Sequence, residues 1–342
     1  MSRARQTAEQ YADVDPQTFG ARPARRTRPR TKDRPDYSGA EIGRVITVDR
    51  GRYRCQLLET GEMVRAAKAR ALGRKGVIVG DLVRLVGDTS GAQGTLARIV
   101  EVEPRSTTLR RTADDNDPAE RPVVANADQL MIVTALADPP PRPGMIDRIL
   151  VAAYEAGIAP ILCLTKADLA DPDEIIAGYA PLDIPIVVTE PDSVLDDVDE
   201  LLSGHVTVLV GHSGVGKSTL INRLVPGADR SIGEVNLVTG RGRHTSTSAI
   251  ALELPDGTGW VIDTPGIRSF GLSHVTPAGV LAAFSDLNEF THDCPRGCHH
   301  TNDDPECGLD TAVADGELPQ ERLASFRRIV DALVEQDQGE SR

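Results

Sequence analysis

The spacing of apolar residues changes along the chain and predicts two different architectures. Between about residues 40 and 103, apolar and polar side chains alternate in short runs separated by glycine-rich turns. This alternation predicts half-buried strands, which we place at 41–48, 52–58, 61–66, 81–86 and 94–100. Five short strands of this kind predict a small closed β-barrel. Arginine and lysine at outward positions favour an OB-fold that follows a nucleic-acid backbone; an SH3-like barrel for protein contacts is the alternative.

From Asp128 onward the apolar runs become continuous and alternate with helical patterns. We predict strands at 130–135, 160–164, 184–188, 205–210 and 260–262, and helices at 144–156, 173–178, 194–203, 276–290 and 317–335. Such strands predict a parallel sheet covered on both faces, with its functional loops at the C-terminal strand ends. Residues 104–127 are expected to be a connector that ends in a polar loop.

Charge is unevenly distributed. Residues 1–111 hold 23 Lys+Arg and 13 Asp+Glu, a net of +10, and residues 112–342 hold 15 and 38, a net of −23, which sum to −13. A basic N-terminal third favours a polyanion partner at one end; the alternative is a solvated surface without a specific partner. Residues 1–36 are expected to be a disordered basic tail, either an RNA-binding arm or a solubilising segment.

The sequence also predicts a cellular location. No apolar run approaches the roughly 18–20 residues of a membrane span, and the first residues lack the apolar core of a secretory signal. Three of the five cysteines lie between 294 and 307, which favours a metal site over a disulfide framework. We therefore expect a cytoplasmic protein without membrane contact.

A phosphate loop is the clearest motif in the chain. Residues 211–218 match G-x-x-x-x-G-K-[ST] between a β-branched apolar run and a helical turn, and the alternative is a glycine-rich turn with a chance lysine. Backbone N–H groups of such a loop surround phosphate oxygens, while Lys217 would reach the β- and γ-phosphates and Ser218 would bind Mg²⁺. The predicted triphosphate contacts are Gly211, His212, Ser213, Gly214, Val215, Gly216, Lys217, Ser218 and Thr219.

Two further motifs stand at strand ends. In Thr165-Lys166-Ala167-Asp168, the Asp168 carboxylate could accept from N1–H and the exocyclic amine of guanine, whereas adenine would present a lone pair. An ordinary surface Lys/Asp pair is the alternative. Asp263-Thr264-Pro265-Gly266 follows the strand at 260–262; Asp263 could hold Mg²⁺ and the Gly266 N–H could reach the γ-phosphate.

Residues 227–248 are predicted to be a mobile nucleotide-sensing switch, because they are rich in Gly, Ser and Thr and lack periodicity. A threonine there, Thr245 or Thr247, would complete a magnesium shell with Ser218 and Asp263. His244, beside them, is the candidate to position the attacking water; a solvated loop histidine is the alternative.

The order of these motifs, with the base motif before the phosphate loop, is rotated relative to an ordinary GTPase. It resembles the circularly permuted GTPases of the RsgA (YjeQ-type) family over residues 40–335, and 105–111, 242–247 and 263–268 are close to the family pattern. Thr165 stands where that family usually has Asn, which removes one side-chain amide contact and is expected to alter base affinity. Residues 188–190 stand where the family is expected to have a serine-containing segment that contacts the base. Ile267 replaces a water-orienting Gln, which the resemblance implies is normal.

The predicted metal ligands are Cys294, Cys298, His300 and Cys307. Three thiolates and one imidazole close a tetrahedral shell, so one structural Zn²⁺ is expected; a metal-free reduced cluster is the alternative. The resemblance selects His300 over His299 through its C-x-H pattern, although the spacing from Cys294 to Cys298 is one residue shorter than the family's.

We predict a multi-domain chain with the basic tail at 1–36 and, as the resemblance implies, an OB-fold at 37–105, a permuted α/β GTPase domain at 106–273 and an α-helical zinc domain at 274–342. The resemblance also implies a monomeric GTP hydrolase of low basal activity that binds the rRNA of the small (30S) ribosomal subunit late in maturation, is stimulated by it, and leaves on hydrolysis. Two alternatives are a P-loop ATPase or kinase with a zinc substrate module, and a nucleotide-gated RNA-binding scaffold with negligible hydrolysis.

Overall fold

The computed structural model describes residues 36–73, 76–112, 120–227, 249–255, 257–264, 279–281, 284–302 and 304–340. Residues 1–35 of the predicted tail at 1–36 and most of the predicted switch at 227–248 therefore lie outside the described residues. Among the helices that the structure describes, none combines the length and apolar character that a membrane span requires.

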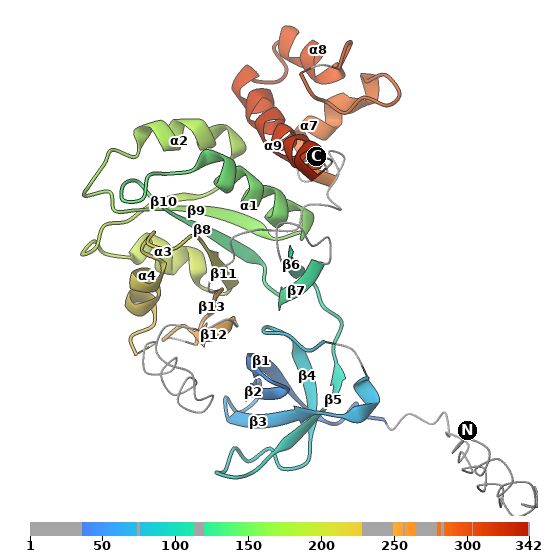
Figure 1. Ribbon diagram of the computed structural model, residues 1–342, viewed down its shortest axis with the longest axis vertical. Coiled ribbons are helices and arrows are strands. Elements are labelled where there is room, and N and C mark those ends of the chain that lie inside the picture. Colours follow the sequence, from blue (N-terminus) through green and yellow to red (C-terminus); the bar gives the residue numbers. More distant parts are fainter. Residues whose placement is uncertain are drawn as a thin grey trace, which may run out of the picture. The chain divides into compact units, whose positions relative to one another are not determined.

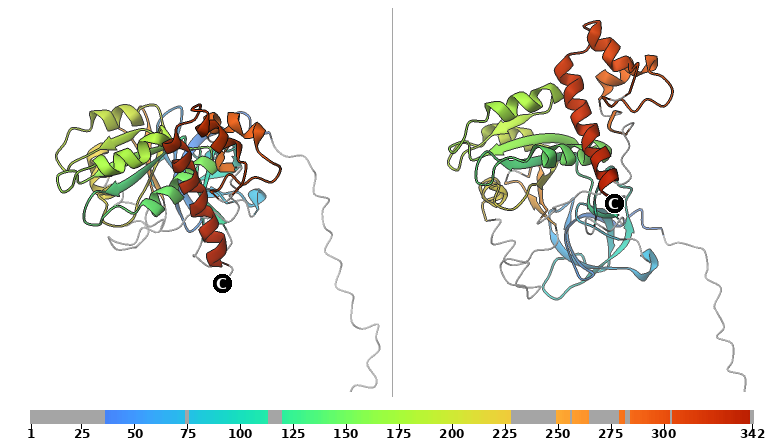
Figure 2. Two further views of the ribbon diagram at one scale, coloured as in Figure 1. Left: turned by 90° about the horizontal axis from the view of Figure 1, so that it is seen from above. Right: turned by 45° about the horizontal axis from the view of Figure 1, so that its top comes forward.

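Five strands form a closed barrel, as the alternating pattern predicted. They are β1 (Glu41–Asp49), β2 (Arg52–Leu57), β3 (Met63–Lys68), β4 (Leu82–Val86) and β5 (Ala97–Val102). The strands pair in the order β1-β2-β3-β5-β4, and β4 returns to β1. The pairing of β3 with β5 is parallel and the others are antiparallel, which is the connectivity of an OB-fold. The right-hand view of Figure 2 shows this ring of strands in blue and cyan.

Neighbouring residues of β1 belong to two different cores. Because successive side chains of a strand point to opposite faces, Val45 packs in the barrel core and Ile46 packs in the large cluster of the α/β region. The β1–β2 register shifts between Val45 and Thr47, which marks a β-bulge. Beyond the bulge, Thr47 pairs with Ile250.

The α/β region contains a mainly parallel sheet with the order β10-β9-β8-β11-β13-β12. Its strands are β8 (Gln129–Ala135), β9 (Ala159–Thr165), β10 (Ile186–Val188), β11 (Val206–Val210), β12 (Ile250–Glu253) and β13 (Trp260–Asp263). Only β12 runs antiparallel to its neighbour in this sheet. The strands expected from the continuous apolar runs are all present.

Helices cover both faces of this sheet, as Figure 1 shows. They are α1 (Pro143–Glu155), α2 (Asp173–Tyr179) with the 3₁₀ turn η3 (Ala180–Leu182), α3 (Asp196–Leu202) and α4 (Lys217–Leu224). Along β8, Leu130 and Ile132 pack with α1, whereas Met131 and Val133 pack with α3 and α4. Every residue of β8 is buried, which explains its unbroken apolar pattern.

The predicted connector at 104–127 is wrong in part, because it contains a hairpin. Strands β6 (Thr108–Thr112) and β7 (Glu120–Ala125) pair antiparallel as a separate two-stranded sheet. Val124 also bridges to Val79 of the barrel region, and the Ala125 N–H donates to the Val79 carbonyl at 3.0 Å. The polar loop at 113–119 lies outside the described residues.

The C-terminal part is helical, but the helix predicted over 276–290 is interrupted. Among its described residues, 279–281 are helical, the helix α7 spans Ser285–Asn288, and the 3₁₀ turn η4 spans Glu289–Asp293. Phe284 leaves helical geometry with φ −104° and ψ 71°, because its buried ring packs edge-on between Tyr154 and Phe326 at 5.1 and 5.3 Å. The helices α8 (Gly308–Ala314) and α9 (Gln320–Glu340) follow.

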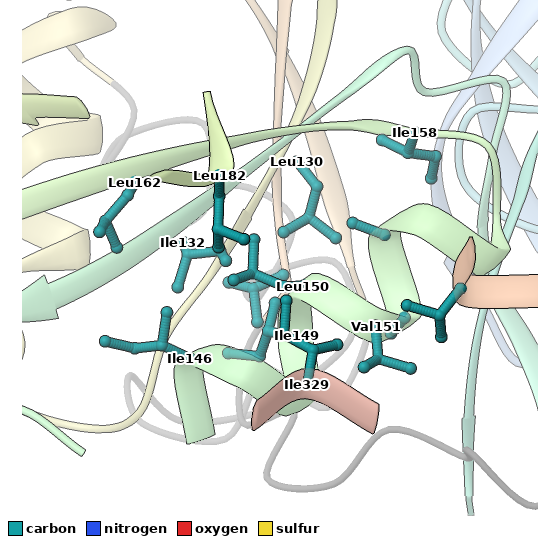
Figure 3. Packing of buried hydrophobic residues seen from close by; sticks show 14 of the residues in the cluster. Leu130, Ile132, Ile146, Ile149, Leu150, Val151, Ile158, Leu162, Leu182 and Ile329 are labelled. Carbon is teal, nitrogen blue, oxygen red and sulfur yellow. The ribbon is translucent and has the colours of Figure 1, made fainter. Parts of the chain in front are cut away.

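Helix α9 packs against α1 and completes the core on that side of the sheet. Ile329 joins the cluster formed by Ile146, Ile149 and Leu150. Figure 3 shows these side chains packed in one cluster with Leu130, Ile132 and Leu182. Polar contacts hold the same surface: the Arg322 guanidinium donates to the Pro181 carbonyl at 2.6 Å and to Asp286 at 2.8 and 3.0 Å.

Candidate functional site

The phosphate loop has the strand–loop–helix geometry that its motif requires. It leaves β11 after Val210 and enters α4 at Lys217. Gly214 and Gly216 adopt φ of 87° and 89°, a left-handed conformation that other residues rarely accept. Gly216 is the N-cap of α4, so the first N–H groups of this helix have no intrahelical acceptor and are suited to an anion.

The structure brings Lys217 and Asp263 together at the sheet edge. The Lys217 ammonium forms an ion pair with the Asp263 carboxylate and also donates to the Thr264 carbonyl at 3.2 Å. Their alignment follows from the sheet, since Asp263 pairs with Leu209 of β11. The buried Thr264 hydroxyl donates to the Leu209 carbonyl at 2.7 Å, which fixes the strand end. A carboxylate is thus paired with the cation that directly precedes the exposed Ser218 in the chain, and these are the groups that a metal–triphosphate site uses.

The Thr165 side chain contacts the phosphate loop. Its side chain is 6% exposed, and its hydroxyl donates to the Val215 carbonyl of the phosphate loop at 2.6 Å. It also lies under Gly216, where a Cβ would meet the Thr165 hydroxyl at 3.4 Å. Thr165 therefore joins the base motif to the phosphate loop.

The other predicted base contacts lie at the C-terminal end of β9. Lys166 adopts φ 60°, and its ammonium donates to the Asp138 carbonyl. Asp168 is exposed, as a residue that reads a ligand edge must be. The loop after β10 lies alongside, because the Ala167 N–H donates to the Thr189 carbonyl at 3.3 Å.

Several predicted site residues cannot be placed. Gly266 and the switch residues His244, Thr245 and Thr247 lie outside the described residues. Conversely, sequence reasoning missed Arg223, which holds the loop after β10 through two backbone carbonyls. Its one available signal was a basic residue in the last turn of the helix that follows the phosphate loop.

The predicted metal ligands converge in the C-terminal region. The ligand atoms of Cys294, Cys298, His300 and Cys307 all lie within 4.8 Å of one another. The His300 Nδ1 lies 3.6, 3.4 and 3.6 Å from the sulfurs of Cys294, Cys298 and Cys307, and the sulfurs of Cys294 and Cys307 are 4.0 Å apart. The neighbouring His299 is exposed.

These separations match the edges of a tetrahedral metal shell. Metal–sulfur bonds of about 2.3 Å and metal–nitrogen bonds of about 2.0 Å imply edges of about 3.8 Å between sulfurs and about 3.5 Å between sulfur and nitrogen. The Gly308 N–H donates to the Cys294 sulfur at 3.2 Å, and the buried Arg327 guanidinium donates to the His300 carbonyl at 3.2 Å. Such outer contacts orient metal ligands, so this group could bind a metal ion.

The sheet, the phosphate loop and the order of the motifs define a P-loop nucleotide-binding protein of permuted topology. The RsgA GTPase family model matches residues 102–273. The small ribosomal subunit biogenesis GTPase RsgA of Pseudomonas aeruginosa LESB58 is 40% identical over 257 residues, 72% of this chain and 74% of that protein. The RsgA of Ectopseudomonas mendocina is 42% identical over 248 residues, 70% of this chain and 71% of that protein. The chain belongs to the RsgA GTPase family.

Two solved structures share the architecture. The crystal structure of YjeQ from Thermotoga maritima superposes with a TM-score of 0.63 at 27% identity and covers 86% of this chain and 98% of its own. YloQ, described as a circularly permuted GTPase, gives a TM-score of 0.65 over 91% of this chain and 99% of its own; at 23% identity it supports the fold alone. Family membership makes GTP hydrolysis the activity of this chain, and P-loop GTPases use Mg²⁺ with the nucleotide.

Proposed function

We propose that this GTPase acts on the small ribosomal subunit late in its maturation and is released when GTP is hydrolysed. The observation that carries the proposal is the match of 40% identity over 72% of the chain to a protein named small ribosomal subunit biogenesis GTPase. The site geometry is compatible with it, since the phosphate loop and base motif lie at one edge of the sheet.

In this proposal each side chain at the sheet edge has one task. Asp168 accepts from guanine and Lys166 lies along the base. Lys217 exchanges its ion pair with Asp263 for the β- and γ-phosphates, which leaves Asp263 and Ser218 to hold Mg²⁺; that ion neutralises charge on the transferred phosphoryl group. Outside the described residues, Thr245 or Thr247 completes the magnesium shell and His244 positions water.

Arginines on neighbouring barrel strands support the proposal of an RNA partner. Arg54 and Arg65 lie directly opposite each other on β2 and β3, and Arg52 and Arg98 flank Ala67 in the next row. Like charges that face each other across strands are destabilising. A polyanion that neutralises these arginines would explain why they lie together. Phosphate contact of this kind is sequence-independent and sensitive to salt.

Zinc is the metal that we propose for the Cys294–Cys307 cluster. Three sulfurs and one imidazole nitrogen form a donor set typical of structural zinc, and four protein ligands leave no open position for chemistry. We also propose the domain division 37–105, 106–273 and 274–342, with the protein a cytoplasmic monomer.

GTP turnover with and without purified small ribosomal subunits tests the function. Because Ile267 cannot orient water as a Gln would, we expect slow basal hydrolysis that rises at least tenfold when subunits order the switch. Lys217→Ala, which removes the phosphate ligand, is the control and should stay inactive under both conditions. Absence of stimulation would contradict the ribosomal proposal, and displacement of bound GDP by ATP as readily as by GTP would contradict the role of Asp168.

A further inference from the structure

The loop after β10 is a tight turn attached to the base motif. The Thr189 N–H donates to the Leu164 carbonyl at 2.7 Å, and the Thr189 carbonyl accepts from Ala167 at 3.3 Å. The Ser193 hydroxyl closes the turn, since it accepts from the Glu190 N–H at 3.0 Å and lies 3.1 Å from the Glu190 carbonyl. We name residues 189–193 the base loop. Its start is fixed by the sheet, whereas its far end needs another support.

Arg223 supplies that support from the helix that begins in the phosphate loop. Its Nη1 donates to the Glu190 carbonyl at 2.8 Å, and its Nη2 donates to the Ser193 carbonyl. The two acceptors are the two ends of the turn, so one planar guanidinium spans it. Hydrogen bonds from a charged donor are stronger than neutral ones.

These contacts close a ring that joins the phosphate loop, α4, the base loop and the base motif. Helix α4 begins at Lys217 in the phosphate loop and ends next to Arg223. From Arg223 the ring continues through the base loop to Ala167, and Thr165 returns it to Val215 of the phosphate loop. In addition to the sheet, one short helix and one arginine therefore connect the base loop to the phosphate loop.

We propose that Arg223 is a positioning residue for guanine: it holds the base loop against Lys166 and Asp168, and so sets guanine-nucleotide affinity without touching the phosphates. The inference rests on the proposed base site at Asp168. A competing explanation is that a cation in the last turn of α4 only stabilises the helix dipole. Lysine would retain that charge but could reach only one of the two carbonyls.

Arg223→Lys therefore separates the two explanations. We expect its Kd for GDP to rise about tenfold, as for loss of one charge-assisted hydrogen bond. The Kd for Mg²⁺-tripolyphosphate, which has phosphates but no base, should stay within twofold of the wild type. In steady state the KM for GTP should rise while kcat is unchanged, because Lys217 and Asp263 are undisturbed. GDP binding equal to the wild type, or an equal loss for GDP and tripolyphosphate, would overturn the proposal.

Two further variants test whether the effect belongs to the contact between Arg223 and the base loop. Ser193→Ala loosens the same turn from the loop side, so its effect on GDP affinity should not add to that of Arg223→Lys. Full additivity would contradict the proposed connection between the two residues. Arg84→Lys is the matched control, because Arg84 pairs with Glu103 in the barrel, and GDP affinity should be unaffected. If the wild type itself failed to prefer GDP over ADP, the proposed base site at Asp168 would be contradicted. That result differs from an Arg223→Lys variant whose GDP affinity equals that of the wild type, which would contradict only the role of Arg223.

Discussion

At the scale of single residues, Thr165 joins two motifs through one hydroxyl group. This hydroxyl, at the start of the base motif, donates to the Val215 carbonyl of the phosphate loop. The contact is buried, so its loss would leave a carbonyl without a donor.

Thr165→Val tests this role, because valine keeps the shape and removes the hydroxyl. We expect the affinities for GDP and GTP to fall together by about 1 kcal/mol, roughly fivefold, with the preference for guanine over adenine unchanged. Competitive nucleotide binding measures both quantities. Asp168→Asn is the contrast, since it should lower the guanine preference; a changed preference in Thr165→Val would refute the assignment.

The sequence allowed residues to be predicted where chemistry restricts the side chain. A phosphate ligand must be a lysine in this motif and a soft-metal ligand must be a cysteine or histidine, so Lys217 and Cys294 could be named in advance. Arg223 could not, because its partners are the backbone carbonyls of Glu190 and Ser193, which have no sequence signature. For the same reason the partner of the Thr165 hydroxyl became visible only in the fold.

A pH prediction concerns the ion pair between Asp286 and Arg322. Burial raises the pKa of Asp286, but hydrogen bonds and the charge of Arg322 outweigh it and hold that pKa below its usual value. A lowered folded-state pKa stabilises the fold above the unfolded pKa of 3.8, and this stabilisation disappears as pH falls through the folded-state value.

We therefore expect Arg322→Gln to destabilise the protein at pH 7 and the difference from wild type to shrink below about pH 4. The ion-pair part should stay under about 1 kcal/mol, because Asp286 is half exposed. Denaturant unfolding at several pH values provides the measurement. A difference that grew on acidification would have the wrong sign.

At the scale of elements, prediction succeeded where burial produces a recognisable pattern of apolar residues. It failed where contacts with distant parts of the chain determine the local structure. The strands of the α/β sheet are buried on both faces, so their apolar runs were unambiguous. The β6–β7 hairpin was missed because its sequence, with Arg110, Arg111 and Pro122, lacks alternation; the bridge from Val124 to Val79 helps to hold it. Phe284 interrupts a helical pattern because two aromatic rings capture its side chain.

Metal removal should act on one group of elements. The four ligands hold η4, the loop at 294–307 and the start of α8 together, and metal-dependent structure is lost when the ligand shell opens. We expect a chelator to increase hydrogen exchange there while β8 and β9 stay protected. Cys298→Ser should reproduce this effect without chelator, and unchanged exchange in both cases would contradict a structural metal.

At the scale of the whole molecule, the barrel is the part expected to meet RNA. Replacing Arg54 and Arg65 with alanine should weaken binding to rRNA and lower the slope of log affinity against log salt by about one to two. Arg84→Ala is the control, because Arg84 already pairs with Glu103. Filter binding across a salt series, with basal GTP turnover as the check on folding, measures the effect. An unchanged slope would move the RNA contact elsewhere.

Helix α9 has a further consequence for the whole chain. It reaches the α/β region through Arg322 and Ile329, while the same polypeptide is joined covalently to β13, which ends at Asp263 beside Lys217. Docking of α9 is thus a unimolecular association, governed by effective concentration rather than by the amount of protein present. Dilution of the protein should therefore leave the docking of α9 unchanged, as it would not for a helix supplied on a separate molecule.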